Sequence, residues 1–202
     1  EKVILTQNSH AGYYPGATAM TVKLIFEKAT YKILGAQIVG YDGVDKRIDV
    51  IATWVRAGMK ADELKDLDLA YAPPYSSAKD PVNMAGFVVE NIKNGIVKQF
   101  YYEDIPSLRE RKDVILLDTR TPFEYMRGHA EDFINIPLDD LRKRLGELDK
   151  TKKIYVMCQS GLRSYLATRI LMQNGFEAYN FVGGFRLYSS IKNEEVLSKQ
   201  CY

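Results

Sequence analysis

The chain has 202 residues, 46% of them hydrophobic, and a formal net charge of +2 at pH 7. This length accommodates two modest domains, and a charge so near zero gives no reason to expect nucleic acid or a membrane surface as a partner. No apolar run reaches membrane-spanning length and no signal-peptide pattern opens the chain. The two cysteines form no disulfide framework, so a reducing cytoplasm is the expected compartment, and no metal site is predicted.

The first half of the chain shows strand patterns before helical ones. Three strand candidates occupy Val3–Thr6, Ala19–Glu27 and Lys32–Tyr41. Helices are predicted over Val44–Ala57, in a short piece at Ala61–Leu64, and from Asp80 to Ile92. Consecutive strands followed by helices favour an α+β domain with an antiparallel sheet.

Strands and helices alternate in the second half. Strands are predicted near Val114–Asp118, Ile134–Ile136, Ile154–Cys158 and Ala178–Phe181, with amphipathic segments at Phe123–Arg127, Leu141–Glu147, Tyr165–Asn174 and Tyr188–Ser198. This order predicts an α/β domain with a parallel sheet and helices on both faces. The domain boundary is expected between residues 96 and 97, giving domains 1–96 and 97–202.

A single cysteine follows the predicted strand Ile154–Cys158, and a helix begins almost at once. The loop consists of Gln159, Ser160, Gly161, Leu162, Arg163 and Ser164. Backbone N–H groups of such a loop can converge on an anion, and the start of a helix adds further donors and a positive dipole end. This environment favours the thiolate form of Cys158, which is the nucleophile.

The size of the loop narrows the chemistry. Four residues separate Cys158 from Arg163, whereas cysteine phosphatases cradle phosphate in a loop with five. The smaller loop suits one extra sulfur atom on the cysteine, which disfavours a small phosphatase. The Arg163 guanidinium is expected to stabilise a thiolate or persulfide, and the alternative is that it ties the loop to a nearby carboxylate. An inert buried thiol is the less favoured interpretation of Cys158.

These residues resemble the rhodanese family of sulfurtransferases, whose loop reads Cys-x-x-Gly-x-Arg-Ser. Further matching motifs are Val114–Arg120, Glu124-Tyr125, Gly128-His129, Ile134–Leu138 and Val182–Phe185. Two departures are Ala130-Glu131-Asp132 after the Gly-His pair and Tyr188 where Trp is common. The resemblance implies that Cys158 takes sulfane sulfur from a donor as a persulfide and passes it to a thiol.

Other charged residues of these motifs are interpreted as structural support. Asp118 is expected to be a buried, hydrogen-bonded carboxylate, and Arg120 to pair with it or with Glu124. His129 is expected to pack and form hydrogen bonds rather than act as a base. The run from Thr121 to Glu124 predicts a capping box with proline at the first helical position.

Three segments of the first half carry further motifs: Ser9–Gly16, Leu34–Gly40 and Tyr71–Pro81. They resemble the dimerisation domain of flavin-dependent pyridine nucleotide-disulfide oxidoreductases, in particular the coenzyme A-disulfide reductase–rhodanese fusion group. The resemblance implies a homodimer in which Tyr13 and Tyr71 reach the disulfide site of the partner subunit, with Tyr14 and Tyr75 as competing candidates. A phenol can donate a hydrogen bond to a developing thiolate.

The chain contains no Gly-x-Gly-x-x-Gly motif after a first strand, so neither dinucleotide-binding domain is expected in it. The resemblance implies a C-terminal fragment that holds no cofactor itself, with FAD and NAD(P)H bound by the full-length enzyme. Coenzyme A, or another low-molecular-weight thiol or persulfide, is the implied acceptor. The alternative is a non-catalytic dimerisation and redox-sensing or docking module. Cys201 is expected to be an incidental exposed thiol.

Overall fold

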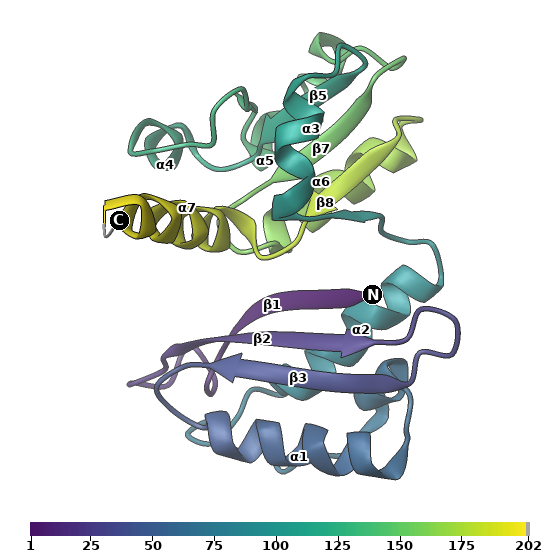
Figure 1. Cartoon of the computed structure of the whole chain (residues 1–202), viewed down its shortest axis with the longest axis vertical. Coiled ribbons are helices and arrows are strands. Elements are labelled where there is room, and N and C mark those ends of the chain that lie inside the picture. Colours follow the sequence, from purple (N-terminus) through teal and green to yellow (C-terminus); the bar gives the residue numbers. More distant parts are fainter. Residues whose placement is uncertain (201–202) are drawn as a thin grey trace. The chain divides into compact units, whose positions relative to one another are not determined.

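The computed structural model describes residues 1–200, with side-chain surroundings up to residue 198. The chain divides into two compact units, Glu1–Gly95 and the part from Ile96 onward, and each is described by itself (Figure 1). The predicted thiol Cys201 lies outside the described residues. Within the described part of the chain, none of the helices is both long and apolar enough to cross a membrane.

The first unit contains a three-stranded antiparallel sheet in the order β1-β2-β3. Its elements are β1 (Lys2–Asn8), β2 (Ala19–Phe26), β3 (Ile33–Val39), α1 (Val44–Ala57), a 3-10 helix (Ala61–Asp66) and α2 (Pro81–Lys93). Alternate strand residues, such as Val22 and Leu24, are fully buried against Ile51 of α1 and Val89 of α2. Figure 1 shows α1 running along β3, with α2 behind the sheet.

Local signals set the ends of these helices. Gly58 caps the end of α1 in the left-handed conformation, with φ of 70°. Asp80 caps the start of α2 by accepting a hydrogen bond from the Val82 N–H, and Pro81 occupies the first helical position. Both helices therefore begin and end close to the predicted residues.

The second unit contains a five-stranded sheet in the order β4-β8-β7-β5-β6, with every pair parallel. Its strands are β4 (Gln99–Phe100), β5 (Val114–Asp118), β6 (Ile134–Asn135), β7 (Lys153–Met157) and β8 (Ala178–Phe181). Its helices are α3 (Ile105–Arg109), α4 (Pro122–Met126), α5 (Leu138–Leu141), α6 (Leu162–Gln173) and α7 (Gly184–Gln200), with 3-10 helices at Tyr102–Asp104 and Leu145–Glu147.

Apolar clusters cover both faces of this sheet because successive side chains of a strand point to opposite faces. In β7, Val156 packs in the cluster that contains Leu171 of α6. Its neighbour Met157 packs in a second cluster with Leu108 of α3 and Tyr188 of α7. The predicted fold class, an antiparallel α+β unit followed by an α/β unit with a parallel sheet, is confirmed.

Three predictions of local structure were incomplete or wrong. Strand β4 and helix α3 were missed, because two and five residues are too few to show a hydrophobic period. The predicted segment Leu141–Glu147 is divided between the end of α5 and a separate 3-10 turn. In the segment from Tyr71, where two prolines predict an extended chain, the N–H groups of Tyr75 and Ser76 instead both donate to the carbonyl of Ala72, which makes a turn.

Candidate active site at Cys158

Cys158 stands at the carboxyl end of β7, which lies between β8 and β5 in the sheet. Its Sγ accepts a hydrogen bond from the Gly161 N–H at 3.1 Å. The Ser164 hydroxyl oxygen lies 3.2 Å from Sγ and 3.1 Å from the Gly161 carbonyl oxygen, the two acceptors for its proton. Gly161 has φ of 108° and caps the N-terminus of α6, so a residue with a side chain would strain the turn. Both donors favour negative charge on the sulfur.

The start of α7 holds the loop from another side. The Phe185 N–H donates to the Cys158 carbonyl at 2.7 Å, and the Arg186 N–H donates to the Gln159 carbonyl at 3.1 Å. Gly184 approaches the loop so closely that a Cβ there would lie 2.6 Å from the Gln159 carbonyl and the Ser160 nitrogen. This packing explains why the Gly-Gly-Phe motif follows β8.

Arg163 makes two hydrogen bonds to Glu124 of α4. Its Nη1 and Nη2 lie 2.7 Å and 2.6 Å from the two carboxylate oxygens. The Arg163 hydrogen bond is the largest cause that lowers the pKa of Glu124 to about 2, and donors on Thr121 add to it. Thr121 and Glu124 also form the predicted capping box. The second of the two interpretations of Arg163, a tie to a nearby carboxylate, therefore describes the observed contact.

Asp118 and Arg120 form a fully buried ion pair, 2.7 Å between Oδ2 and Nη2. The guanidinium also donates to the Gly128 carbonyl at 2.8 Å and to Gln159 Oε1 at 3.4 Å. Its Cζ lies 3.8 Å from the ring centroid of Phe185. This pair connects β5, the Cys158 loop and α7.

The remaining predicted residues of the second unit range from exposed to fully buried. The His129 ring stacks on Tyr125 with centroids 4.0 Å apart, and its Nδ1 lies 3.2 Å from the Tyr125 carbonyl oxygen. Ser160 is half-buried, and Leu162 is 62% exposed. Cys158 itself has no exposed surface, so a donor can reach its sulfur only after neighbouring groups move.

Sequence reasoning missed what Glu124 and the start of α7 do at the loop. Glu124 was assigned only to the capping box and to a possible pair with Arg120. Glu124 and Arg163 both belong to motifs that resemble the same family, and this was the one sequence feature that could have linked them. The backbone donors of Phe185 and Arg186 left no signal, because any residue except proline supplies an N–H.

In the first unit, the structure brings Tyr13 and Tyr71 together. Their hydroxyl oxygens lie 3.0 Å apart, and the residues are 77% and 49% exposed. The hydrogen bond with Tyr13 is the largest cause that raises the pKa of Tyr71. The competing candidate Tyr14 packs instead edge-on against His10 at 5.7 Å.

Arg47 of α1 holds the two loops that carry these tyrosines. It is buried in an ion pair with Asp80, 2.9 Å between Nη2 and Oδ2. Its Nη2 also donates to the Ser9 carbonyl at 2.7 Å and to Ser76 Oγ at 3.4 Å. Ser9 precedes the Tyr13 loop and Ser76 ends the Tyr71 turn, so one side chain positions both.

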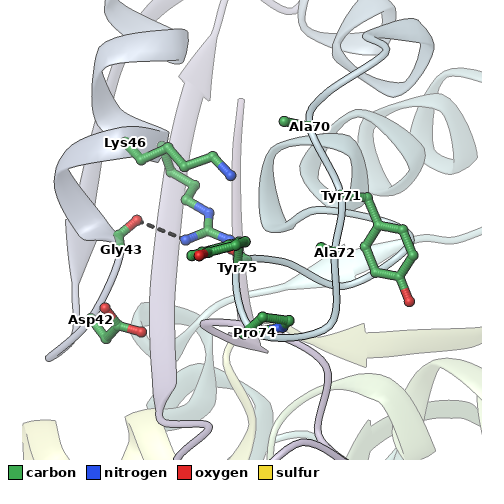
Figure 2. A pocket seen from close by; sticks show the side chains of 9 residues that line it. Asp42, Gly43, Lys46, Ala70, Tyr71, Ala72, Pro74 and Tyr75 are labelled. Atoms are coloured by element: carbon green, nitrogen blue, oxygen red, sulfur yellow. Dashed lines mark hydrogen bonds between the residues drawn. The ribbon is translucent and has the colours of Figure 1, made fainter.

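A cavity of about 390 Å³ lies beside this cluster. It is lined by Asp42, Gly43, Lys46, Arg47, Ala70, Tyr71, Ala72, Pro74 and Tyr75. Figure 2 shows that Tyr75 and Tyr71 extend to opposite sides of their segment, with Lys46 on the Tyr75 side. Among the described residues, no group of three or more His, Cys, Asp or Glu side chains could hold a metal ion.

Two family models match the chain. The pyridine nucleotide-disulphide oxidoreductase dimerisation domain matches residues 1–82, and the rhodanese-like domain matches residues 102–190. The coenzyme A disulfide reductase of Staphylococcus aureus (strain bovine RF122 / ET3-1) is 44% identical over 85 residues, which are 42% of this chain and 19% of that protein. The protein of the same name from Staphylococcus haemolyticus is 42% identical over 92 residues, 46% of this chain and 21% of that protein.

Two solved structures are similar over most of the chain. Reduced CoADR-RHD of Bacillus anthracis is 50% identical with a TM-score of 0.93, over 96% of this chain and 35% of that one. The NAD-dependent persulfide reductase of A. fulgidus is 42% identical with a TM-score of 0.80, over 91% of this chain and 33% of that one. The chain thus spans about a third of these structures and about a fifth of the curated relatives.

The arrangement of motifs, the fold and both family models agree. Residues 1–82 match the pyridine nucleotide-disulphide oxidoreductase dimerisation domain, and residues 102–190, which follow them, match the rhodanese-like domain.

Proposed function

We propose that the second unit transfers sulfane sulfur through a persulfide on Cys158, and that Arg163 assists as part of the loop. The observation that carries this proposal is the pair of donors on the cysteine sulfur, the Gly161 N–H and the Ser164 hydroxyl. Such donors stabilise the Cys158 thiolate that attacks the donor and the Cys158 thiolate that is released when the acceptor takes the sulfur.

The reaction has two balanced steps. The Cys158 thiolate attacks the outer sulfur of a persulfide R–S–SH, the donor S–S bond breaks, and the thiolate RS⁻ leaves. Cys158 then carries the group –S–SH. An acceptor thiolate attacks the outer sulfur, receives it as a new persulfide, and releases the Cys158 thiolate. No external oxidant or reductant is needed, because one S–S bond replaces another in each step.

The chain is proposed to be the C-terminal part of a flavin-dependent coenzyme A-disulfide or persulfide reductase that acts as a homodimer. Support comes from the names of the relatives and from the dimerisation-domain match. FAD and NAD(P)H would bind to domains that this chain does not contain. Coenzyme A would serve as the acceptor thiol, and Tyr13 and Tyr71 would face the partner's disulfide site. A reducing compartment such as the cytoplasm would keep these thiols active.

The test is to treat the chain with an alkyl persulfide and follow the mass of the Cys158 peptide. A mass gain of one sulfur atom, lost again when coenzyme A is added with formation of its persulfide, is the expected result. Cys158→Ser should abolish transfer, whereas Ser160→Ala is the matched control because no side-chain hydrogen bond of Ser160 holds the loop. Equal transfer by the Cys158→Ser variant would contradict the mechanism. Adducts limited to sulfenic acid or glutathione would instead favour redox sensing.

A further inference from the structure

We propose that Glu124 determines the donor specificity of the Cys158 site: by pairing with Arg163 it selects for persulfide donors and against dianionic donors such as thiosulfate. This inference rests on the proposed sulfur transfer and deepens it. Glu124 contacts no reacting atom, so it acts through Arg163 as a positioning residue.

The first step of the argument is the charge balance around the sulfur. Arg163 lies within the loop, and both of its terminal nitrogens are bound to Glu124 at 2.7 Å and 2.6 Å. Arg120, which reaches the loop through Gln159, is neutralised by buried Asp118. Both of these cations are therefore already paired with a carboxylate.

Other groups near the loop add little charge. Phe123 and Leu162, next to the two members of the Glu124–Arg163 pair, are 64% and 62% exposed and apolar. Arg127 and Arg186 are exposed to solvent, where water weakens their field. The Gly161 N–H and the Ser164 hydroxyl contact Cys158 Sγ. The N–H groups that begin α6 are further donors, and Glu124→Gln leaves them unchanged.

The second step concerns the charge that each donor brings. With thiosulfate, the Cys158 thiolate attacks the outer sulfur, the S–S bond breaks, sulfite leaves as SO₃²⁻, and Cys158 keeps –S–S⁻. Three negative charges meet in that encounter. A protonated alkyl persulfide has no charge at its reacting end. When it meets Cys158, the single negative charge is that of the Cys158 thiolate. A site whose guanidinium is already neutralised therefore stabilises the encounter with a persulfide far better than the encounter with thiosulfate.

The capping box supplies a suitable test variant. Glu124 Oε2 accepts from the Thr121 N–H and hydroxyl, and glutamine also serves at this position of a capping box. Glu124→Gln therefore removes the charge while keeping the groups that start α4. Arg163→Gln removes the opposite charge, and the double variant restores the balance.

The experiment measures kcat/KM for thiosulfate and for an alkyl persulfide, each with the same acceptor thiol, and takes their ratio. Glu124→Gln should raise the thiosulfate-to-persulfide ratio about tenfold, as expected for one new charge-assisted hydrogen bond. Arg163→Gln should lower the ratio, and the double variant should return it to the wild-type value. Glu110→Gln, at an exposed carboxylate of the same unit, should leave it unchanged.

Different failures have different meanings. If the wild-type chain transfers sulfur but the ratio is the same in Glu124→Gln and Arg163→Gln, Glu124 does not set specificity and the sulfur-transfer proposal stands. If wild-type Cys158 accepts sulfur from neither donor, the proposed function itself is wrong. Should Glu124→Gln fail to fold, Arg163→Gln alone decides: a fall in the ratio supports the inference and a constant ratio overturns it.

Discussion

The hydroxyl groups of Tyr13 and Tyr71 form a hydrogen bond of 3.0 Å although 58 positions separate the two residues in the chain. The bond joins two loops. A second contact between the same loops comes from the Ala11 N–H, which donates to the carbonyls of Pro73 and Ser76. The pair forms an exposed polar group in which one phenol donates a hydrogen bond to the oxygen of the other, and either can be the donor. This is the group that we propose faces a partner's disulfide site.

Tyr13→Phe should lower the pKa of Tyr71 toward its ordinary value. The hydrogen bond with Tyr13 is the largest cause of the raised pKa, and the variant removes it. The titration can be followed by NMR of the chain labelled with ¹³C at the tyrosine ring carbons. Tyr41→Phe, at a site 94% exposed in the same unit, is the control. An unchanged Tyr71 titration in Tyr13→Phe would show that the pair is not formed in solution.

Arg47→Ala should destabilise the first unit by about 3 to 5 kcal/mol, because it leaves the Asp80 carboxylate buried without its partner. Arg47 and Asp80 are only 2% and 3% exposed. Trp54 is the single tryptophan of the chain and belongs to α1, so its fluorescence reports unfolding of this unit in urea. Arg56→Ala, at an exposed site of the same helix, should change stability little. A similar loss of stability in Arg47→Ala and Arg56→Ala would contradict the role of Arg47 in holding the two loops.

The Glu124–Arg163 pair should make the stability of the second unit depend on pH. Folding lowers the pKa of Glu124 from 4.5 to about 2, so the ionised form stabilises the folded state at pH values above the unfolded pKa. This contribution should fall as the pH drops from about 4.5 toward 2. At neutral pH, Glu124→Gln should cost about 1 to 2 kcal/mol, after allowance for partial exposure.

Pulse proteolysis in urea with pepsin, which is active at acid pH and cuts unfolded chains, measures this difference. Mass spectrometry of peptides from β7 and α6 reports on the second unit. The wild type and Glu124→Gln should converge in stability near pH 2, whereas Glu110→Gln should match the wild type throughout. A constant difference between wild type and Glu124→Gln across this range would refute the assigned ionisation.

Gly184→Ala should slow sulfur transfer about tenfold to a hundredfold, since a displaced catalytic loop loses its alignment. The new Cβ would lie 2.6 Å from the Gln159 carbonyl, and φ of 65° adds strain at this position. The persulfide assay of Cys158 provides the measurement. Gly146→Ala, where nothing lies within 4 Å of the added Cβ, should behave like the wild type. Full activity in Gly184→Ala would mean that α7 does not position the loop.

Much of the fold could be predicted because it depends on residues close together in the chain. Helix α1 was predicted with its observed bounds, Val44–Ala57, since its apolar spacing and Gly58 are local signals. Strand β8, Ala178–Phe181, was also predicted in full. The two-residue strand β4 was missed because parallel pairing with β8, rather than its own sequence, makes it a strand.

The sequence by itself determined the order of elements, the two fold classes and the cysteine loop ahead of α6, because hydrophobic period, capping residues and loop length act over a few residues. Tertiary structure decided the partners. Arg163 had a thiolate or a carboxylate as candidate partners, and packing of α4 beside the loop placed Glu124 within reach, 39 positions away. The meeting of Tyr13 with Tyr71 arises in the same way, because Arg47 brings two distant loops together through long-range contacts that no local pattern records.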